Sequence, residues 1–324
     1  MKRKTPAETL AKKRSILLER TQAALNIDEQ KALELLRIGR NQSIRLNPLA
    51  GDISNTQEEL GSLGWVGEQF PWMKEGYTLR EGQQAIRDSN LVTEGKVYIQ
   101  NAASWLPPIL LQPKPDETIL DVCAAPGGKT THVAAIANNQ THITANDNSR
   151  ARLAKLQSVC RQMHADIARF TLYDARQLSR KLDGEQFDKI LLDAPCSGEG
   201  MMQFDRDKDF TMWSVVQIKR LQVLQKHILR QAWELLCPGG TLVYSTCTMA
   251  PEENEAVIDY ALRTFEPIEL VPIEQDLPNR VAAVQSWNGK SYDPRLQGTM
   301  RLIPSQEVEA FFVCVLKKPV NTTL

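Results

Sequence analysis

The 324-residue sequence contains no C-x-x-C pair and only four histidines, which are scattered along the chain. Its six cysteines, at positions 123, 160, 196, 237, 247 and 314, are also scattered. This spacing argues against both a zinc site and a disulfide framework, so we expect no metal. Scattered free thiols are typical of a reducing compartment, and we expect the protein in the cytoplasm.

Long apolar runs are absent as well. The N-terminus is charged and does not contain the apolar stretch of about 7–15 residues that marks a signal peptide. No uninterrupted apolar segment approaches the ~20 residues needed to cross a bilayer, so no membrane partner is expected. We find no internal repeat and no low-complexity segment, and we expect a monomer.

Net charge identifies no partner, because 39 basic residues balance 39 acidic ones. The distribution along the chain is uneven, since residues 1–46 carry about twice as many basic as acidic side chains. Basic runs stand at residues 2–4 and 12–14. Such clusters attract phosphate backbones, although the solvated end of a helix is an equally good explanation.

Two regions differ in their patterns. Leucine and isoleucine at helical spacing predict helices over residues 5–40, and QSIRLNPLAG predicts a short strand that ends in a turn. Glycine and proline punctuate the chain from there to residue 93. We expect residues 1–93 to form a basic helical segment followed by a small α/β domain.

From about residue 115 strands and helices alternate. The expected strands are 117–123, 142–147, 169–174, 187–195, 239–247, 266–273 and 309–318. The expected helices are 129–139, 149–164 and 218–240, the last ending in proline and glycine. Apolar strands that alternate with helices predict an α/β fold with a parallel sheet covered on both faces. Ligands of such sheets bind beyond the carboxyl ends of the strands.

The segment DVCAAPGGKT, residues 121–130, joins the first of these strands to the first helix. Its last three residues match the end of the phosphate-binding motif G-x-x-x-x-G-K-[ST], so a phosphate-loop ATPase is one interpretation. Three features weaken it, and the third, Asp147, lies further along the chain. Cys123 occupies the position of the first glycine, and Pro126 has no N–H to offer a phosphate.

A carboxylate, Asp147, follows Gly127 by twenty residues, at the end of the next expected strand. This spacing suits a carboxylate that binds a ribose diol. A tight glycine-containing turn with such a carboxylate fits an adenosine ligand without phosphates, and S-adenosylmethionine fits. Asp174 could accept a hydrogen bond from the adenine amino group, or it could cap the following helix. Including Asp121 and Asp193, four expected strands carry an aspartate at or near their carboxyl ends.

Two cysteines, Cys196 and Cys247, follow the fourth and fifth expected strands in short polar loops. A lone cysteine usually packs as a small hydrophobic residue, as we expect for Cys160, Cys237 and Cys314, but these two are candidate nucleophiles. A thiolate beside a methyl donor suits methylation of a pyrimidine. Its addition to carbon 6 turns the ring into an enamine-like species, so that carbon 5 can attack the methyl group.

Two further side chains would assist this reaction. Asp193, hydrogen-bonded to N3 or N4 of cytosine, would polarise the ring. A free thiol has a pKa of about 8.5, so a cation or a helix dipole must favour the thiolate. Lys129 is the candidate cation, and an exposed helix lysine is the alternative.

Three segments, DVCAAPGGKT, LLDAPCSGEG and YSTCTMAPEENE, together resemble the strongest motifs of the Nop/Sun-domain family of RNA cytosine-C5 methyltransferases. VYIQNAASWLPPILL resembles the segment before that family's catalytic sheet, and the likeness runs from SIRLNP to AFFVCVLKK. The resemblance implies a Rossmann-like class I methyltransferase domain with helices on both faces, here residues 94–320. It also implies a small RNA-recognition-like domain before it.

The resemblance also implies roles for particular residues. Cys247 would attack the base, Cys196 would assist release of the product, and Asp193 would serve both cofactor and base. The implied contacts of S-adenosylmethionine are Cys123, Ala124, Ala125, Pro126, Gly127, Gly128, Lys129, Asp147, Asp174 and Asp193. The family usually has glycine where Ala310 stands, and alanine would be strained if φ were positive there.

The implied partner is RNA, either ribosomal or transfer RNA, with its target cytosine unpaired or flipped out. Phosphate contacts are expected from the N-terminal segment and the small domain, including Arg45. Residues 281–304 suit an RNA-facing loop, although a tryptophan is more often packed. The aromatic and basic residues interleaved there are Trp287, Lys290, Tyr292, Arg295 and Arg301. DNA as substrate and a non-catalytic RNA assembly factor are the remaining alternatives.

Overall fold

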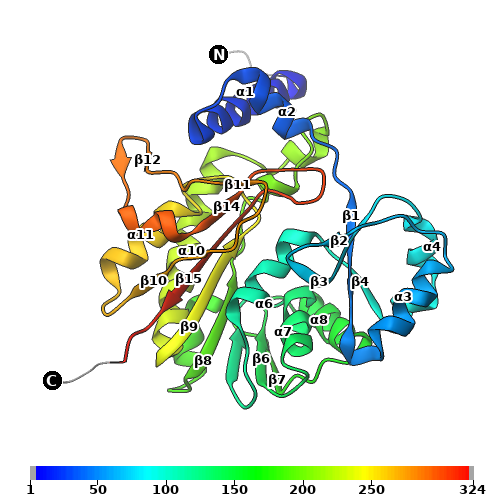
Figure 1. Cartoon of the computed structure of the whole chain (residues 1–324). Coiled ribbons are helices and arrows are strands. Elements are labelled where there is room, and N and C mark those ends of the chain that lie inside the picture. Colours follow the sequence, from blue (N-terminus) through cyan, green and yellow to red (C-terminus); the bar gives the residue numbers. More distant parts are fainter. Residues whose placement is uncertain (1–4, 321–324) are drawn as a thin grey trace.

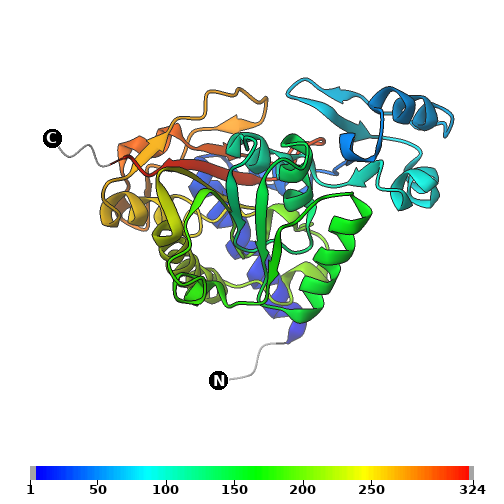
Figure 2. The same cartoon turned by 90° about the horizontal axis from the view of Figure 1, so that it is seen from below.

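A computed structural model describes residues 5–320 of the chain. Two N-terminal helices, a small four-stranded domain and a larger α/β domain follow one another along the sequence (Figure 1). Seen from below, the small domain lies beside the larger domain (Figure 2). None of the helices within residues 5–320 is long and apolar enough to span a membrane.

The helices predicted over residues 5–40 form as α1 (Pro6–Leu25) and α2 (Glu29–Arg37). A capping box at Thr5 starts α1 by satisfying backbone N–H groups that have no partner within the helix. Leu17 of α1 joins a buried cluster with Phe210 of the larger domain. The two helices therefore pack on the larger domain, although the small domain follows them in sequence.

The small domain contains an antiparallel sheet of order β2-β3-β1-β4. Its elements are β1 (Gln42–Leu46), α3 (Ile53–Gly61), β2 (Gln69–Phe70), β3 (Met73–Leu79), α4 (Gln83–Asp88), α5 (Asn90–Thr93) and β4 (Val97–Ile99). Ile44 and Leu46 lie in the core of this domain, and Arg45 points to the opposite face of β1. Because β4 pairs with β1, this sheet extends beyond residue 93.

The larger sheet has the order β11-β14-β15-β9-β8-β5-β6-β7. Its strands are β5 (Thr118–Asp121), β6 (His142–Asn146), β7 (Arg169–Thr171), β8 (Phe187–Asp193), β9 (Leu236–Thr246), β10 (Glu269–Val271), β11 (Arg280–Val281), β14 (Met300–Leu302) and β15 (Phe311–Lys317). Strands β5 to β9 pair in parallel, as the sequence predicts. The last strand differs, because β15 runs antiparallel to β9.

Helices cover both faces of this sheet. Ile190 and Leu192 of β8 are buried in one cluster, and Leu191 between them is buried in another. The first cluster contains residues of α9 (Leu178–Lys181), α10 (Val215–Leu235) and α11 (Glu255–Thr264). The second contains residues of α6 (Leu106–Leu111) and α7 (Gly128–Ile136), and α8 (Arg150–Gln162) contacts α7. This alternation confirms the predicted α/β fold and explains why the strands are apolar on both faces.

Two sequence predictions differ from the structure. The helix expected to reach residue 240 ends at Leu235, because β9 begins at Leu236 and includes Pro238, whose missing N–H would break a helix. The segment 281–304, expected as a loop, contains β11, β14 and a hairpin of β12 (Ser286–Trp287) and β13 (Lys290–Ser291).

Candidate active site

The functional side chains meet at the carboxyl ends of the parallel strands. The chain passes from β5 to β6 and β7 on one side and then returns to β8 and β9 on the other, so the switch point lies between β5 and β8. Across this edge, from β9 to β7, the residues at or just after the strand ends are Cys247, Asp193, Asp121, Asp147 and Asp174.

A cavity of about 460 Å³ lies at this switch point. Its walls contain Cys247 and Asp193 together with much of the glycine-containing loop. The loop residues are Cys123, Ala124, Ala125, Pro126, Gly128 and Lys129, with Asp121 before them. The small domain and the segment after it supply Gln42, Ser43, Tyr98, Ile99, Gln100, Asn101 and Ser104. A ligand in this cavity therefore touches both domains.

The glycine-containing loop is shaped by close packing. Gly127 has φ +116°, a conformation that other residues rarely adopt, and α7 begins at the next residue. A Cβ atom on Gly128 would lie 2.9 Å from side-chain atoms of both Gln100 and Tyr98. The second glycine thus permits the small domain to approach the loop.

Asp121 lies beneath this loop and is buried. Its Oδ2 accepts a hydrogen bond of 2.7 Å from Thr130, whereas its Oδ1 has no partner among the described residues. Burial raises the pKa of Asp121 to about 7. An orphan carboxyl oxygen in the cavity wall can bind a polar ligand group, such as the amino group of S-adenosylmethionine.

The two aspartates predicted to bind the adenosine both have local partners. Asp147 is buried, accepts the Ser149 N–H and forms an ion pair of 3.2 Å with Arg152. Asp174 caps the turn after β7 and pairs with Arg176, whose hydrogen bonds lower the pKa of this carboxyl. Neither lines the cavity, so their contacts with a ribose and an adenine stay predictions.

The two loop cysteines are in contact, with their Sγ atoms 3.3 Å apart. Both are free thiols. The hydrogen bond to Cys247, together with burial, raises the pKa of Cys196 well above its ordinary value. A protonated Cys196 thiol can donate a hydrogen bond to the sulfur of Cys247. The role of Cys247 as the attacking thiol stays a prediction.

Lys129 and Asp193 form an ion pair of 2.7 Å beside the thiols. Burial lowers the pKa of Lys129, but the charge of Asp193 and its hydrogen bond outweigh that effect, and the pKa is raised overall. The second oxygen of Asp193 accepts a hydrogen bond of 2.8 Å from Ser245. Lys129 is thus a half-buried cation in the site, not an exposed helix lysine.

Sequence reasoning missed a second cation, Arg40, which lies between α2 and β1. It is half-buried and donates a hydrogen bond to the carbonyl oxygen of Gly200. Burial lowers the pKa of Arg40, while the negative charges of Glu309 and Cys247 act in the opposite direction. Nothing in the local sequence marks this arginine, because only the fold brings it to the Cys247 loop.

A buried hydrogen-bond network also joins the two cysteine loops. Glu253 accepts hydrogen bonds from the backbone and hydroxyl of Ser197 and, at 2.9 Å, from Gln225 of α10. The hydroxyl of Ser197 contacts Thr248 at 2.8 Å, and Thr248 donates to Glu199 at 3.1 Å. Three acidic side chains in the stretch EENE are buried. The sequence does not reveal that burial, so the network could not be predicted from it.

Several RNA-contact predictions are wrong. Arg301 is buried in an ion pair of 2.6 Å with Glu255, and Tyr292 is buried as well. Arg45 is 1% exposed, and its guanidinium donates to Thr131 of α7. These side chains join parts of the protein and cannot reach a phosphate backbone.

Smaller predictions have mixed outcomes. The basic run at residues 2–4 lies outside the described residues. Cys160 and Cys314 are core residues as predicted, but Cys237 is only half-buried at the start of β9. Ala310 does not have positive φ, so the expected strain is absent.

The sheet, its switch-point cavity and the glycine-containing loop define a Rossmann-like methyltransferase. Residues 108–317 match the family model described as 16S rRNA methyltransferase RsmB/F. The chain belongs to this family.

Known proteins resemble most of the chain. It is 36% identical to the tRNA (cytosine(49)-C(5))-methyltransferase of Pyrococcus abyssi over 86% of this chain and 88% of that protein. It is also 36% identical to ribosomal RNA small subunit methyltransferase F of Aeromonas salmonicida, over 86% of this chain but 57% of that protein. A crystal structure of a methyltransferase homologue from Pyrococcus horikoshii is 30% identical, with a TM-score of 0.78, over 94% of this chain and 99% of that one.

Proposed function

We propose that this protein transfers a methyl group from S-adenosylmethionine to carbon 5 of a cytosine in ribosomal or transfer RNA. The observation that carries this proposal is that Cys247 lines the cavity beside the glycine-containing loop while its thiol contacts the thiol of Cys196. Six free thiols suit a reducing cytoplasm, where we propose that it acts as a monomer.

The donor molecule supplies an electrophilic methyl group on its sulfonium. The loop from Cys123 to Gly128 and the orphan oxygen of Asp121 would hold its amino-acid part. Asp147 and Asp174 lie at the ends of the next two strands, where its adenosine would extend. Lys129 is held by Asp193, and both side chains line the same cavity.

Three side chains act on the base. The thiolate of Cys247 forms a bond to carbon 6, and the ring then places electron density on carbon 5. A proton carried by Asp193 passes to N3 as the thiolate adds, and the carboxylate then accepts a hydrogen bond from the N3–H, which favours this redistribution. After methyl transfer a water molecule in the cavity takes the proton from carbon 5, the carbon–sulfur bond breaks, and the Cys196 thiol donates a hydrogen bond to the departing thiolate of Cys247.

A direct test compares two serine variants. Cys247→Ser should transfer no radiolabelled methyl group to RNA and should form no adduct. Cys196→Ser should accumulate a covalent protein–RNA adduct that survives denaturing electrophoresis. Mass spectrometry of digested RNA should detect 5-methylcytidine only with the wild type. Wild-type rates from Cys247→Ser would disprove the assignment of the nucleophile.

The ATPase alternative loses support from the same geometry. The amine of Lys129, which a phosphate-loop protein needs for its nucleotide, is engaged by Asp193. Binding of ATP without binding of S-adenosylmethionine, measured by calorimetry, would revive it.

A further inference from the structure

Most basic side chains near the N-terminal helices and the last strands are engaged within the protein. Lys13 donates hydrogen bonds to backbone carbonyls. Four arginines each form an ion pair with a carboxylate, namely Arg14, Arg20, Arg295 and Arg301. The small domain does not supply a positive surface for RNA either, because residues 42–99 contain eight acidic and five basic side chains. A negatively charged domain repels phosphates, so the electrostatic attraction of RNA must come from elsewhere.

A set of cations without acidic partners lies on the outer side of α10. No aspartate or glutamate occurs between Val215 and Trp233. Lys219, Arg220 and Arg230 are exposed, and Lys226 is half-buried. Within residues 5–320 none of these four forms an ion pair. Together with Lys290 of the neighbouring hairpin they are named the α10 basic face.

The cations of this face repel one another. Burial lowers the pKa of Lys226, and the positive charge of Lys290 lowers it further. Arg230 donates to the hydroxyl of Tyr260 at 3.0 Å, and Lys226 stands 5.2 Å from the same ring. The nearby carboxylate of Asp259 is held by Arg263 at 2.9 Å. A bound anion would relieve this repulsion. A solvated helix face of mixed charge has no such repulsion to relieve.

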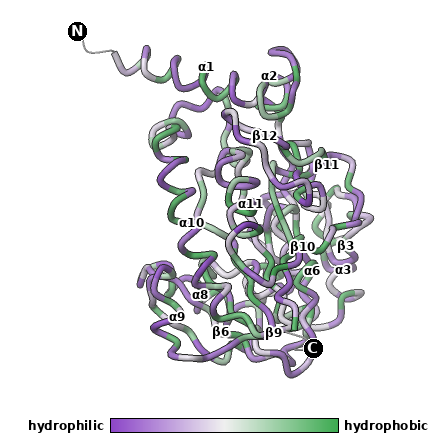
Figure 3. Tube along the Cα trace, turned by 90° about the vertical axis from the view of Figure 1, so that its left-hand side faces the viewer, coloured by the Kyte–Doolittle hydropathy of each residue, from purple (hydrophilic) through white to green (hydrophobic). Residues whose placement is uncertain are grey.

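Apolar side chains are exposed among these cations. Met212, Val216 and Val223 are 77%, 60% and 54% exposed. Figure 3 shows α10 at the edge of the molecule with hydrophilic and hydrophobic residues mixed along it. A surface with cations and uncovered apolar groups can contact both phosphates and the sugar or base portions of a nucleic acid.

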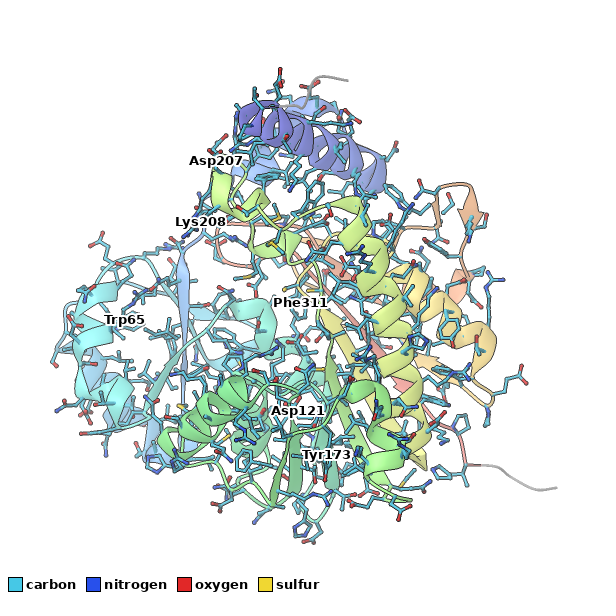
Figure 4. All side chains as sticks on the ribbon, turned by 180° about the vertical axis from the view of Figure 1, so that it is seen from behind. Trp65, Asp121, Tyr173, Asp207, Lys208 and Phe311 are labelled. Carbon is cyan, nitrogen blue, oxygen red and sulfur yellow. The ribbon has the colours of Figure 1, made fainter. Side chains whose placement is uncertain are left out.

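The inner side of α10 reaches the active site. Gln225 donates hydrogen bonds of 2.9 Å to the carbonyl oxygen of Pro195 and to Glu253, so it holds the loop that carries Cys196. The α10 basic face is thus about one helix diameter, ~10 Å, from that loop. Figure 4 shows the strand end at Asp121 between the small domain and α10.

We propose that the α10 basic face binds the phosphate backbone of the substrate RNA next to the nucleotide whose base enters the cavity. The proposal rests on the proposed function and adds the surface on which that RNA lies.

A matched pair of double variants tests it. Lys219→Gln/Arg220→Gln removes two exposed charges from the face, and Lys74→Gln/Arg87→Gln removes two exposed charges from the small domain. Methylation of 16S rRNA and tRNA transcripts is measured with both, alongside calorimetric binding of S-adenosylmethionine. Loss of two phosphate contacts should raise the KM for RNA about tenfold at 0.15 M salt and reduce the salt slope of log Kd by about 1.4. The kcat and the affinity for S-adenosylmethionine should stay at wild-type values.

The control variant should match the wild type in every measurement. Unchanged RNA affinity in the α10 variant, or a larger loss in the small-domain variant, would overturn the docking surface while leaving the proposed function intact. A change of oligomeric state in the α10 variant, measured by sedimentation, would assign the face to a second copy and also overturn it. A wild-type chain that methylates no RNA would instead refute the proposed function.

Discussion

Glu253 should make the protein less stable as the pH rises towards neutrality. Burial raises the pKa of this carboxyl from 4.5 to about 7. A folded state that holds the proton more tightly than the unfolded state is favoured at acid pH and loses that advantage between pH 4.5 and 7. The difference between the two pKa values corresponds to about 3 kcal/mol of unfolding free energy.

The variant Glu253→Gln removes this titration and can retain the contacts. Its carboxamide oxygen can accept from the Ser197 N–H and from Gln225, and its amino group can donate to the Ser197 hydroxyl, which then donates to Thr248. Urea unfolding at several pH values should show the variant about 3 kcal/mol more stable than the wild type at pH 8, and thermal unfolding about 5 °C higher. The difference should shrink towards pH 5.

The neighbouring Glu252→Gln is the matched control and should behave in the opposite way. Burial raises the pKa of Glu252, but the hydrogen bonds and charge of Arg20 lower it more strongly. This variant should therefore be less stable than the wild type at pH 8, and its deficit should fade as the pH falls below about 4. A constant offset for Glu253→Gln across the pH range, or a gain confined to acid pH, would refute the reasoning.

Three further predictions concern buried contacts. Arg301→Met should cost about 3–5 kcal/mol of unfolding free energy in urea titrations, because it leaves the buried charge of Glu255 unpaired. The double variant with Glu255→Met removes both charges and should recover much of that loss. Gly128→Ala should weaken binding of S-adenosylmethionine in calorimetry, since its Cβ would lie 2.9 Å from two small-domain side chains. Lys129→Met should lower kcat at least tenfold while the RNA affinity stays constant, because Asp193 loses its cation; an unchanged kcat would contradict that role.

The sequence was sufficient for the parallel part of the fold. Apolar strands of regular spacing and the helices between them carry their own periodic signals, so β5 to β9 and α7, α8 and α10 lie close to their predicted positions. Short elements such as β11 and β14 were missed, because a strand of two or three residues gains its identity from pairing with a neighbour. The docking of α1 on the larger domain is likewise a long-range contact that no local pattern encodes.

In the candidate site, too, local features could be predicted from the sequence and long-range contacts could not. The placement of Cys247, Cys196 and Asp193 at one edge could be predicted, because each lies at or just after the end of a strand and parallel strands bring their carboxyl ends together. Their protonation could not be predicted, since the raised pKa of Cys196 depends on a contact across two loops. The basic residues expected at the RNA were misjudged for a related reason. Whether an arginine is available depends on the carboxylates that the fold places beside it, as Glu255 is placed beside Arg301.

The two sides of α10 link the proposed RNA-binding surface to the active site. The helix holds the Cys196 loop through Gln225 on its inner side and presents the α10 basic face on its outer side. A phosphate bound to the outer side would thus stand at a fixed distance from the thiols, because a packed helix of 21 residues does not bend between them. Methyl transfer needs the base held within about 0.5 Å of its productive position, with carbon 6 about 3–3.5 Å from the sulfur proposed to attack it. Anchoring the backbone on the same rigid element that positions the thiols supplies that precision, whereas anchoring it on the small domain would let any movement between the domains displace the base.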